Sequence, residues 1–100
     1  MDDDLRAKLD RRNELSLRVR RLLVEDLHVP RELDEIDPDT PLFGVGLTLD
    51  SIDAVDLLVQ LEVKFGINIP SDAEGRAALR SVNCIVDLVL AREDAERGAA

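Results

Sequence analysis

The segment from Leu47 to Pro70 constrains the fold most, because it predicts a helix with two apolar faces. One stripe follows the i, i+3, i+4, i+7, i+11 spacing of a helix surface that packs on a core. Its members are Ala54, Leu57, Leu58, Leu61 and Phe65. A second stripe, on roughly the opposite face, contains Ile52, Val55, Val59 and Val63, flanked by Asp53, Asp56 and Glu62. A small domain buries one stripe of a helix, so the second predicts a surface for partners.

The start of this helix is the main candidate site. Ser51 is either the helix cap or the first helical residue after an Asp50 cap, with Asp53 supporting the helix dipole. A serine at an exposed helix start offers its hydroxyl, and an attached phosphodiester would gain from the positive end of the dipole. His28, the only histidine, lies at the end of another predicted helix. No visible motif therefore activates Ser51 as a nucleophile, so we expect no catalytic residue and regard a hydrolase as a distant alternative.

The rest of the chain predicts an all-α bundle of three longer helices and one short helix. A first helix is expected over residues 13–28, with its basic Arg18, Arg20 and Arg21 pointing away from its apolar stripe of Leu15, Val19, Leu22, Leu23 and Leu27. A long ordered loop follows, from Pro30 to Leu49. Its expected anchors on the core are Ile36, Leu42, Phe43 and Leu47. A short helix within residues 71–79, interrupted by Gly75, precedes a last helix that starts near Ser81 and displays Val82, Ile85, Val86 and Val89.

Length and composition predict a single small domain with an aliphatic core. One hundred residues make one domain, and with only two aromatic residues among 45% apolar ones its core must be aliphatic. We expect a charged extension over residues 1–12, the folded domain over 13–91 and a charged tail over 92–100. Such a core suits helix packing and could open to admit a flexible apolar ligand.

Charge divides the chain unevenly. Residues 1–23 hold seven basic and five acidic side chains, whereas residues 24–100 hold six basic and seventeen acidic ones, which together give the net charge of −9. The acidic body disfavours nucleic acid, because phosphate binding requires Lys and Arg. It should instead attract basic protein surfaces.

Several site classes are excluded by the pattern of residues. Cys84 is the only cysteine, so neither an internal disulfide nor a thiolate metal site is expected, and its thiol is either half-exposed or buried. The acidic run 34–39 lacks the central Gly and closing Glu of a calcium-binding EF-hand, so no metal is expected. No membrane span and no signal peptide are evident, which predicts a cytoplasmic protein.

The helix start and the sequence after it resemble the acyl carrier protein family. The resemblance rests on two segments, Asp50-Ser51-Ile52-Asp53-Ala54-Val55-Asp56-Leu57 and the closing Phe65-Gly66-Ile67-Asn68-Ile69-Pro70. It spans roughly Leu15 to Leu90. The resemblance implies that Ser51 carries 4'-phosphopantetheine, transferred from coenzyme A, and that Asp50 helps the transferase position its magnesium. It also implies a recognition surface. Its residues would be Ile52, Asp53, Val55, Asp56, Val59 and Glu62.

By this resemblance the chain is a stand-alone, monomeric carrier that holds acyl groups as thioesters and catalyses nothing. Its expected partners are a phosphopantetheinyl transferase (holo-acyl-carrier-protein synthase) and enzymes with basic docking patches. These enzymes would be acyl-transferring, ketosynthase-type or acyl-carrier ligase enzymes of fatty-acid, polyketide or related synthesis.

Three residues depart from the family pattern and leave alternatives open. Ile52 replaces the usual Leu, Thr48 stands where Gly is common, and Val63 replaces a position that is often acidic. Leu49 before Asp50-Ser51 argues against a peptidyl carrier, which usually shows Gly-Gly before its His-Ser or Asp-Ser. A D-alanyl or other aminoacyl carrier stays open. So does an unmodified helical adaptor that binds partners through the second helix.

Overall fold

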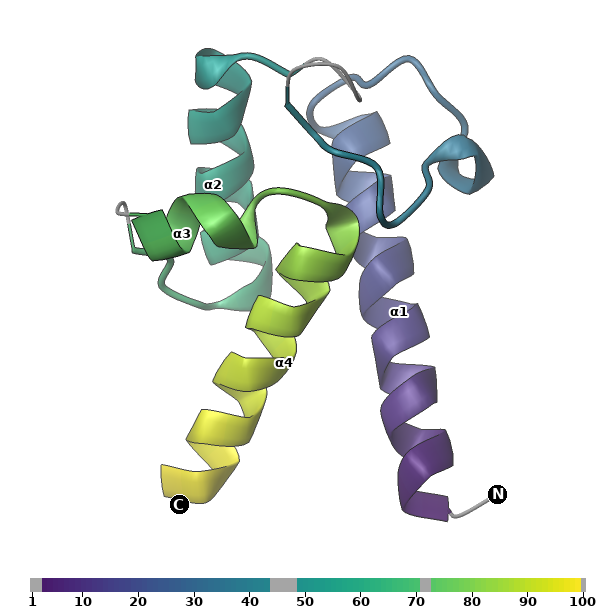
Figure 1. The fold of residues 1–100 in the computed structure, drawn as a ribbon, viewed down its shortest axis with the longest axis vertical. Coiled ribbons are helices and arrows are strands. Elements are labelled where there is room, and N and C mark those ends of the chain that lie inside the picture. The colour runs from purple at the N-terminus through teal and green to yellow at the C-terminus, as the bar shows by residue number, and fades with distance from the viewer. Residues whose placement is uncertain (1–2, 44–48, 71–72, 100) are drawn as a thin grey trace.

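The computed structural model describes residues 3–43, 49–70 and 73–99 (Figure 1). They form four α-helices and one 3-10 helix. The elements are α1 (Asp3–Glu25), η1 (Leu33–Glu35), α2 (Ser51–Phe65), α3 (Ala73–Ala78) and α4 (Val82–Ala99). The described residues contain no strand, and their only β-type pairing is an isolated bridge between Phe43 and Leu49. The predicted all-α fold, with three longer helices and one short one, is confirmed.

The helices place the start of α2 and the two chain ends on opposite sides of the molecule. Figure 1 shows α1 and α4 converging in the middle of the molecule and separating toward the termini. The short helix α3 crosses between α2 and α4 and packs on α4, whereas η1 packs on α1. The candidate modification site thus lies far from both termini.

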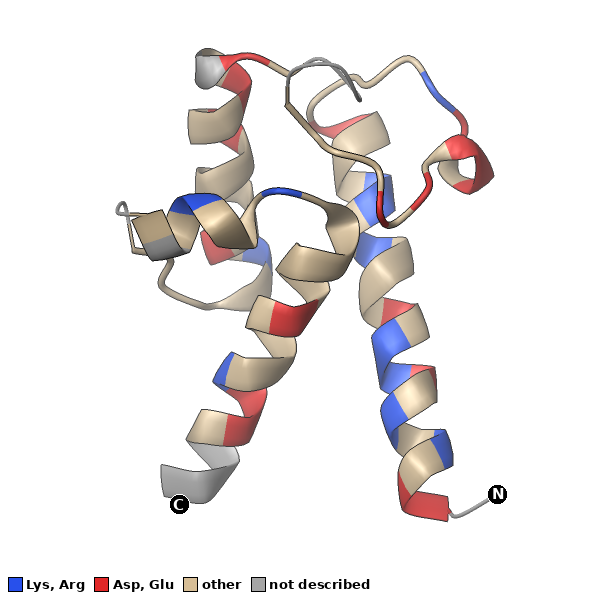
Figure 2. Cartoon of the chain, viewed as in Figure 1, with Lys and Arg blue, Asp and Glu red and all other residues tan. Residues whose placement is uncertain are grey.

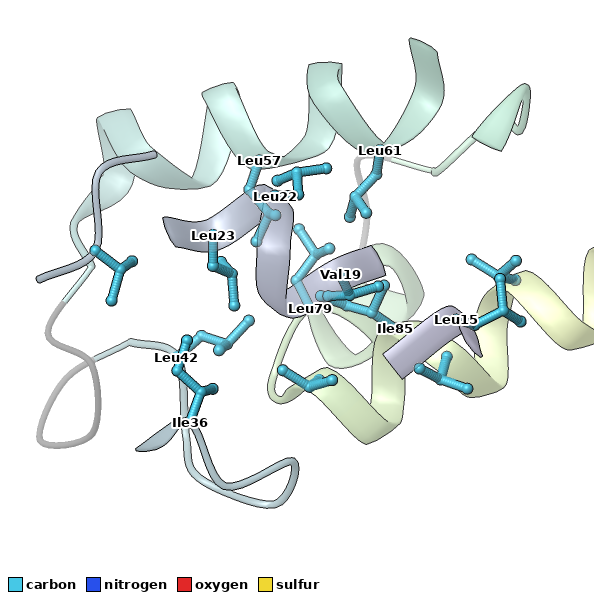
Figure 3. Packing of buried hydrophobic residues seen from close by; sticks show 14 of the residues in the cluster. Leu15, Val19, Leu22, Leu23, Ile36, Leu42, Leu57, Leu61, Leu79 and Ile85 are labelled. Atoms are coloured by element: carbon cyan, nitrogen blue, oxygen red, sulfur yellow. The ribbon is translucent and has the colours of Figure 1, made fainter. Parts of the chain in front are cut away.

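An aliphatic cluster holds the helices together (Figure 3). From α2, Leu57 and Leu61 point toward the residues of α1 and are fully buried. Burying a side chain of this size contributes about 1.5–3 kcal/mol. The predicted stripes of the first and last helices also supply the core. Its members there are Leu15, Val19, Leu22, Leu23, Val82, Ile85, Val86 and Val89, while Leu27 is half-buried against it.

Two helices are longer than predicted. The first begins at Asp3 and ends at Glu25, not over 13–28, and the last continues through the charged residues to Ala99. Ion pairs that join the two helices support the extra length: Arg12 lies 2.6 Å from Asp87, and Arg11 pairs with Glu93. The hydrogen bonds that Arg11 donates to the Glu93 carboxylate raise the pKa of Arg11. The division into extension, domain and tail remains a prediction.

The first helix ends earlier because the chain turns at His28. This residue has a φ of 58°, in the left-handed region, and the following Val29 N–H donates to the Leu23 carbonyl at 3.0 Å. A left-handed residue at this position satisfies carbonyls that the helix leaves open.

The long loop is pinned to the helices, as expected. Ile36 and Leu42 are buried, and Phe43 is half-buried against the cluster. Backbone bonds fix the loop to the start of α4: Leu42 N–H donates to the Arg80 carbonyl at 3.0 Å, and Asn83 N–H donates to the Pro38 carbonyl at 2.9 Å. The fourth predicted anchor, Leu47, lies outside the described residues.

Candidate functional site

The start of α2 is organised by two aspartates. Asp50 is the N-cap, and its Oδ1 accepts from the N–H groups of Ile52 and Asp53, both at 3.0 Å. The Asp53 carboxylate accepts from the Asp50 N–H at 3.0 Å, which completes a capping box. Ser51 is therefore the first helical residue and not the cap. Of the two alternatives for this position, the structure selects the Asp50 cap.

The second apolar stripe of α2 faces solvent. Figure 1 shows α2 at the edge of the molecule, with one side free of other described elements. On that side the exposed fractions are 73% for Ile52, 63% for Val55, 47% for Val59 and 75% for Val63. The prediction that this stripe points outward is confirmed. Its role in binding partners stays a prediction.

The three acidic residues beside this stripe are used differently. Asp53 belongs to the capping box, and the Glu62 carboxylate accepts from the Ile69 N–H at 3.0 Å, so both help to hold the local backbone. The Asp56 side chain is exposed and makes no hydrogen bond or ion pair within the described part of the chain. The sequence gives no signal for the Glu62 contact, because Ile69 lies beyond the helix end.

Arg18 of the first helix and an ion pair between Lys64 and Asp26 secure the far end of α2. The Arg18 guanidinium lies 4.4 Å from the centre of the Phe65 ring and donates to the Lys64 carbonyl at 3.4 Å, and Lys64 pairs with Asp26 at 2.9 Å. A cation near an aromatic face and a carbonyl at a helix end are both favourable. Arg18 is exposed, as expected of a side chain that points away from the apolar stripe, and it also contacts α2.

The other basic residues of this face follow the prediction in part. Arg21 is exposed, whereas Arg20 is half-buried and donates to the carbonyls of Ser16 and Leu33. Arg20 therefore joins the first helix to the long loop through η1. Side-chain-to-carbonyl contacts of this kind carry no periodic signature in a sequence.

At the last turn of α2, Gly66 has φ 63° and ψ 36°, the left-handed conformation that ends many helices. The predicted stop at this residue is confirmed. Its conformation turns the chain into the Ile67–Pro70 segment, where Ile69 is buried.

Charge is distributed over the described surface as the sequence suggests. Figure 2 shows most of the Lys and Arg residues on α1, whereas Asp and Glu dominate η1 and the first turn of α2. No group of three His, Cys, Asp or Glu side chains in the described residues is arranged to hold a metal. None of the described helices is long and apolar enough to cross a membrane.

Comparisons with known proteins identify the family of this sequence. The family profile described as a phosphopantetheine attachment site matches residues 17–73, a segment that contains the C-terminal part of α1, the long loop and all of α2. The chain is also 37% identical, over 65 residues, to a protein named D-alanyl carrier protein from Streptococcus sanguinis (strain SK36). That match covers 65% of this chain and 78% of the relative.

Family membership settles the general role. Proteins of this family receive 4'-phosphopantetheine covalently and act as non-catalytic carriers for other enzymes, among them the transferase that attaches the group. The capped start of α2 and its exposed apolar stripe are compatible with that role. The chain belongs to the phosphopantetheine-binding carrier proteins, the family of the acyl carrier proteins.

Proposed function

We propose that Ser51 is the attachment residue and that the arm holds acyl groups as thioesters. The supporting observation is the position of Ser51: it lies within the matched segment, at the first residue of a helix whose cap is Asp50. A phosphodiester attached there gains from the N-terminal end of the α2 dipole. A transferase forms this ester by joining the serine oxygen to the phosphorus of coenzyme A and releasing adenosine 3',5'-bisphosphate.

Asp50 has a proposed role beyond capping. Both helix N–H groups bind one oxygen, Oδ1, and a carboxylate has lone pairs for further partners. We propose that this carboxylate also helps the transferase to position its magnesium during attachment. Its dual use would couple the folding of the helix start to recognition by the transferase.

The outward stripe of α2 is the proposed docking surface. Its exposed apolar side chains give a partner something to bury, and Asp56 gives a basic partner a charge to meet. The full proposed surface comprises Ile52, Asp53, Val55, Asp56, Val59 and Glu62. A carrier must leave each enzyme after delivery, so a small and partly electrostatic interface fits the role, with the chain acting as a monomer.

Two classes of cargo are candidates for the arm. A fatty-acid or polyketide-type acyl group agrees with the resemblance of residues 50–57 to acyl carriers. An aminoacyl group is favoured by the similarity to the D-alanyl carrier protein of Streptococcus sanguinis, at 37% identity. The two candidates differ in the enzyme that loads the arm: an acyl transferase or ligase in one case, and an aminoacyl-activating ligase in the other.

Intact-mass measurement tests the attachment site. The purified chain is incubated with coenzyme A, magnesium and a broad-specificity phosphopantetheinyl transferase, beside Ser51→Ala and the control Thr48→Ala. We expect one added phosphopantetheine in the natural chain and in Thr48→Ala, and none in Ser51→Ala. Modification of Ser51→Ala would refute the assignment of this serine. Absence of modification in all three, with the transferase active on another carrier, would refute attachment by this class of transferase.

A further inference from the structure

The first turns of α1 carry two leucines that lie outside the core. Leu5 and Leu9 are one helical turn apart on the same side of α1, with exposed fractions of 49% and 43%. Neither belongs to the aliphatic cluster, and the buried residues of this helix begin only at Leu15. The fold therefore leaves a short apolar surface at the N-terminal end of α1, and we call Leu5 and Leu9 the N-terminal stripe.

The charges that border the N-terminal stripe are positive. Residues three apart are neighbours on a helix, so Lys8 lies beside Leu5, and Arg6 lies beside Leu9. Both cations are exposed, and within the described part of the chain neither side chain forms an ion pair or a hydrogen bond. On the opposite half of the helix surface lie the nearby aspartates, Asp3, Asp4 and Asp10. The stripe thus combines apolar area with positive charge.

A hollow between α1 and α4 continues this surface. The ion pairs of Arg11 and Arg12 join the two helices, and Figure 1 shows α1 and α4 separating beyond them toward the termini. The hollow has a volume of about 260 Å³, and its described lining residues are Ala7, Lys8, Arg11, Leu90 and Asp94. Its acidic residue, Asp94, is already engaged within the chain. Lys8 lies both beside the stripe and in the lining, so the two form one surface.

An acidic amphipathic helix matches this surface. Its apolar side chains would cover the N-terminal stripe, and its carboxylates would meet Arg6 and Lys8. A symmetric pair of copies matches less well. With Leu5 of one copy against Leu9 of the other, antiparallel α1 helices would bring Lys8 close to Arg6 of the second copy, and like charges repel.

The outer stripe of α2 in a second copy is also apolar and acidic. Its contact with the N-terminal stripe would be head-to-tail, however, and contacts of this kind do not close into a dimer. It would also cover the surface through which the carrier is proposed to reach its enzymes. The charge and the geometry together therefore favour a different protein as the occupant.

We propose that the N-terminal stripe, with Arg6 and Lys8, is a second docking surface, and that it binds an acidic amphipathic helix of another protein. Figure 1 shows the N-terminal end of α1 and the start of α2 at opposite ends of the molecule. The bound protein would therefore hold the carrier while Ser51 and the outer stripe of α2 stay free for other enzymes. The inference goes beyond the proposed function and does not depend on modification of Ser51.

Two synthetic peptides of about three heptads test this proposal. Both have Leu at the a and d positions, and the flanking positions are Glu in one peptide and Lys in the other. Fluorescence anisotropy of each labelled peptide measures its Kd for the full chain, before and after phosphopantetheine transfer. Circular dichroism of each variant establishes that the helices are retained.

We expect the Glu peptide to bind to the N-terminal stripe. Leu5→Ser with Leu9→Ser should raise its Kd at least about tenfold, because the apolar contacts at the centre of the interface are lost. The matched control, Val55→Ser with Val59→Ser on the outer stripe of α2, should leave this Kd unchanged. Saturation with the Glu peptide should also leave the rate of phosphopantetheine transfer unchanged.

A charge variant tests the class of partner and keeps both leucines. Arg6→Gln with Lys8→Gln should raise the Kd of the Glu peptide about threefold at low salt. The difference should vanish at high salt, because exposed charges are screened. Arg21→Gln removes an exposed cation from the other half of α1 and should have no effect.

Each other outcome overturns a separate part. Absence of binding, or equal binding after both leucines are replaced, refutes the N-terminal stripe as a docking surface. Equally tight binding of the Lys peptide to this stripe refutes the acidic class, and inhibition of transfer by the Glu peptide refutes simultaneous use of the two surfaces. Self-association in sedimentation velocity that requires Leu5 and Leu9 would make a second copy the occupant. Failure of phosphopantetheine transfer refutes the proposed function alone, because the peptide measurements do not use the arm.

Discussion

The two faces of α2 are nearly equal in apolar content, but one is buried and the other is exposed. On the inner face Leu57 and Leu61 are fully buried among residues from the first and last helices, while on the outer face Val55 and Val63 are exposed to solvent. The inner side chains stabilise the fold, because burial removes apolar surface from water. The outer ones gain nothing from folding and are available for a second protein.

The comparison shows that hydropathy alone does not decide which stripe is the core. The side chains that lie opposite each face determine which stripe is buried. The inner face meets Leu22 and Val19 of α1, as Figure 3 shows, whereas the outer face meets no described element. Substitutions on the two faces should therefore separate stability from partner recognition.

The largest effect is expected from the inner face. Leu61→Ala should lower the free energy of unfolding by about 2–5 kcal/mol, because it removes a fully buried side chain and leaves a cavity. Urea denaturation followed by circular dichroism measures this loss. The matched variant on the outer face, Val63→Ala, should change stability by less than about 0.5 kcal/mol. Equal losses in the two variants would contradict the assignment of the faces.

The next largest effect on stability is expected where α3 packs against the segment that follows α2. A Cβ on Gly75, in α3, would lie 1.6 Å from the Pro70 carbonyl oxygen, too close for any side chain. Gly75→Ala should therefore push α3 away from the segment after α2 and cost about 1–3 kcal/mol of stability. The interruption expected at this glycine is wrong: α3 runs through Gly75, and the glycine instead allows the close approach of Pro70.

Gly66→Ala is the control for that measurement. A Cβ there meets nothing within 4 Å, so its cost of about 1 kcal/mol comes from the left-handed backbone alone. A Gly75→Ala variant as stable as Gly66→Ala, with unchanged spectra, would show that α3 can move without consequence for the inner face.

A smaller effect is expected at the cap, where the two faces begin. Asp50→Ala should destabilise the protein by about 0.5–2 kcal/mol, since two helix N–H groups lose their acceptor. Asp50→Asn caps nearly as well but lacks the charge, so it should retain stability while the rate of phosphopantetheine transfer falls. Thermal unfolding and transfer kinetics measure the two effects separately. Unchanged transfer in Asp50→Asn would refute the proposed magnesium role.

The sequence predicts the features that repeat along one element. Helical periodicity identifies both stripes of α2, and local capping chemistry identifies Asp50 and Gly66 at its ends. The ends of α1 and α4 escape prediction because several of their charged residues form ion pairs across the two helices, as between Arg12 and Asp87. Such pairs depend on the fold and leave no pattern in either segment.

The candidate site shows the same limit. The outward direction of Val55 and its neighbours follows from periodicity, but the contacts of Glu62 with Ile69 and of Arg18 with Phe65 do not. Both join residues that are distant in the sequence or lie beyond a helix end. The hollow between α1 and α4 is likewise lined by two helices that only the folded chain brings together.

The smallest expected change in stability is on the outer face, where the largest change in recognition is expected. The double variant Val55→Ser with Val59→Ser should keep the free energy of unfolding within about 0.5 kcal/mol, since both residues lie on the surface, 63% and 47% exposed. Its KM in phosphopantetheine transfer should rise about tenfold, which corresponds to about 1.4 kcal/mol of lost binding. Asp56→Asn is the electrostatic counterpart. It should raise KM less, and its effect should vanish at high salt, because exposed charges are screened. If the serine variant binds the transferase as well as the natural chain does, recognition does not use this stripe, and its exposure has another cause.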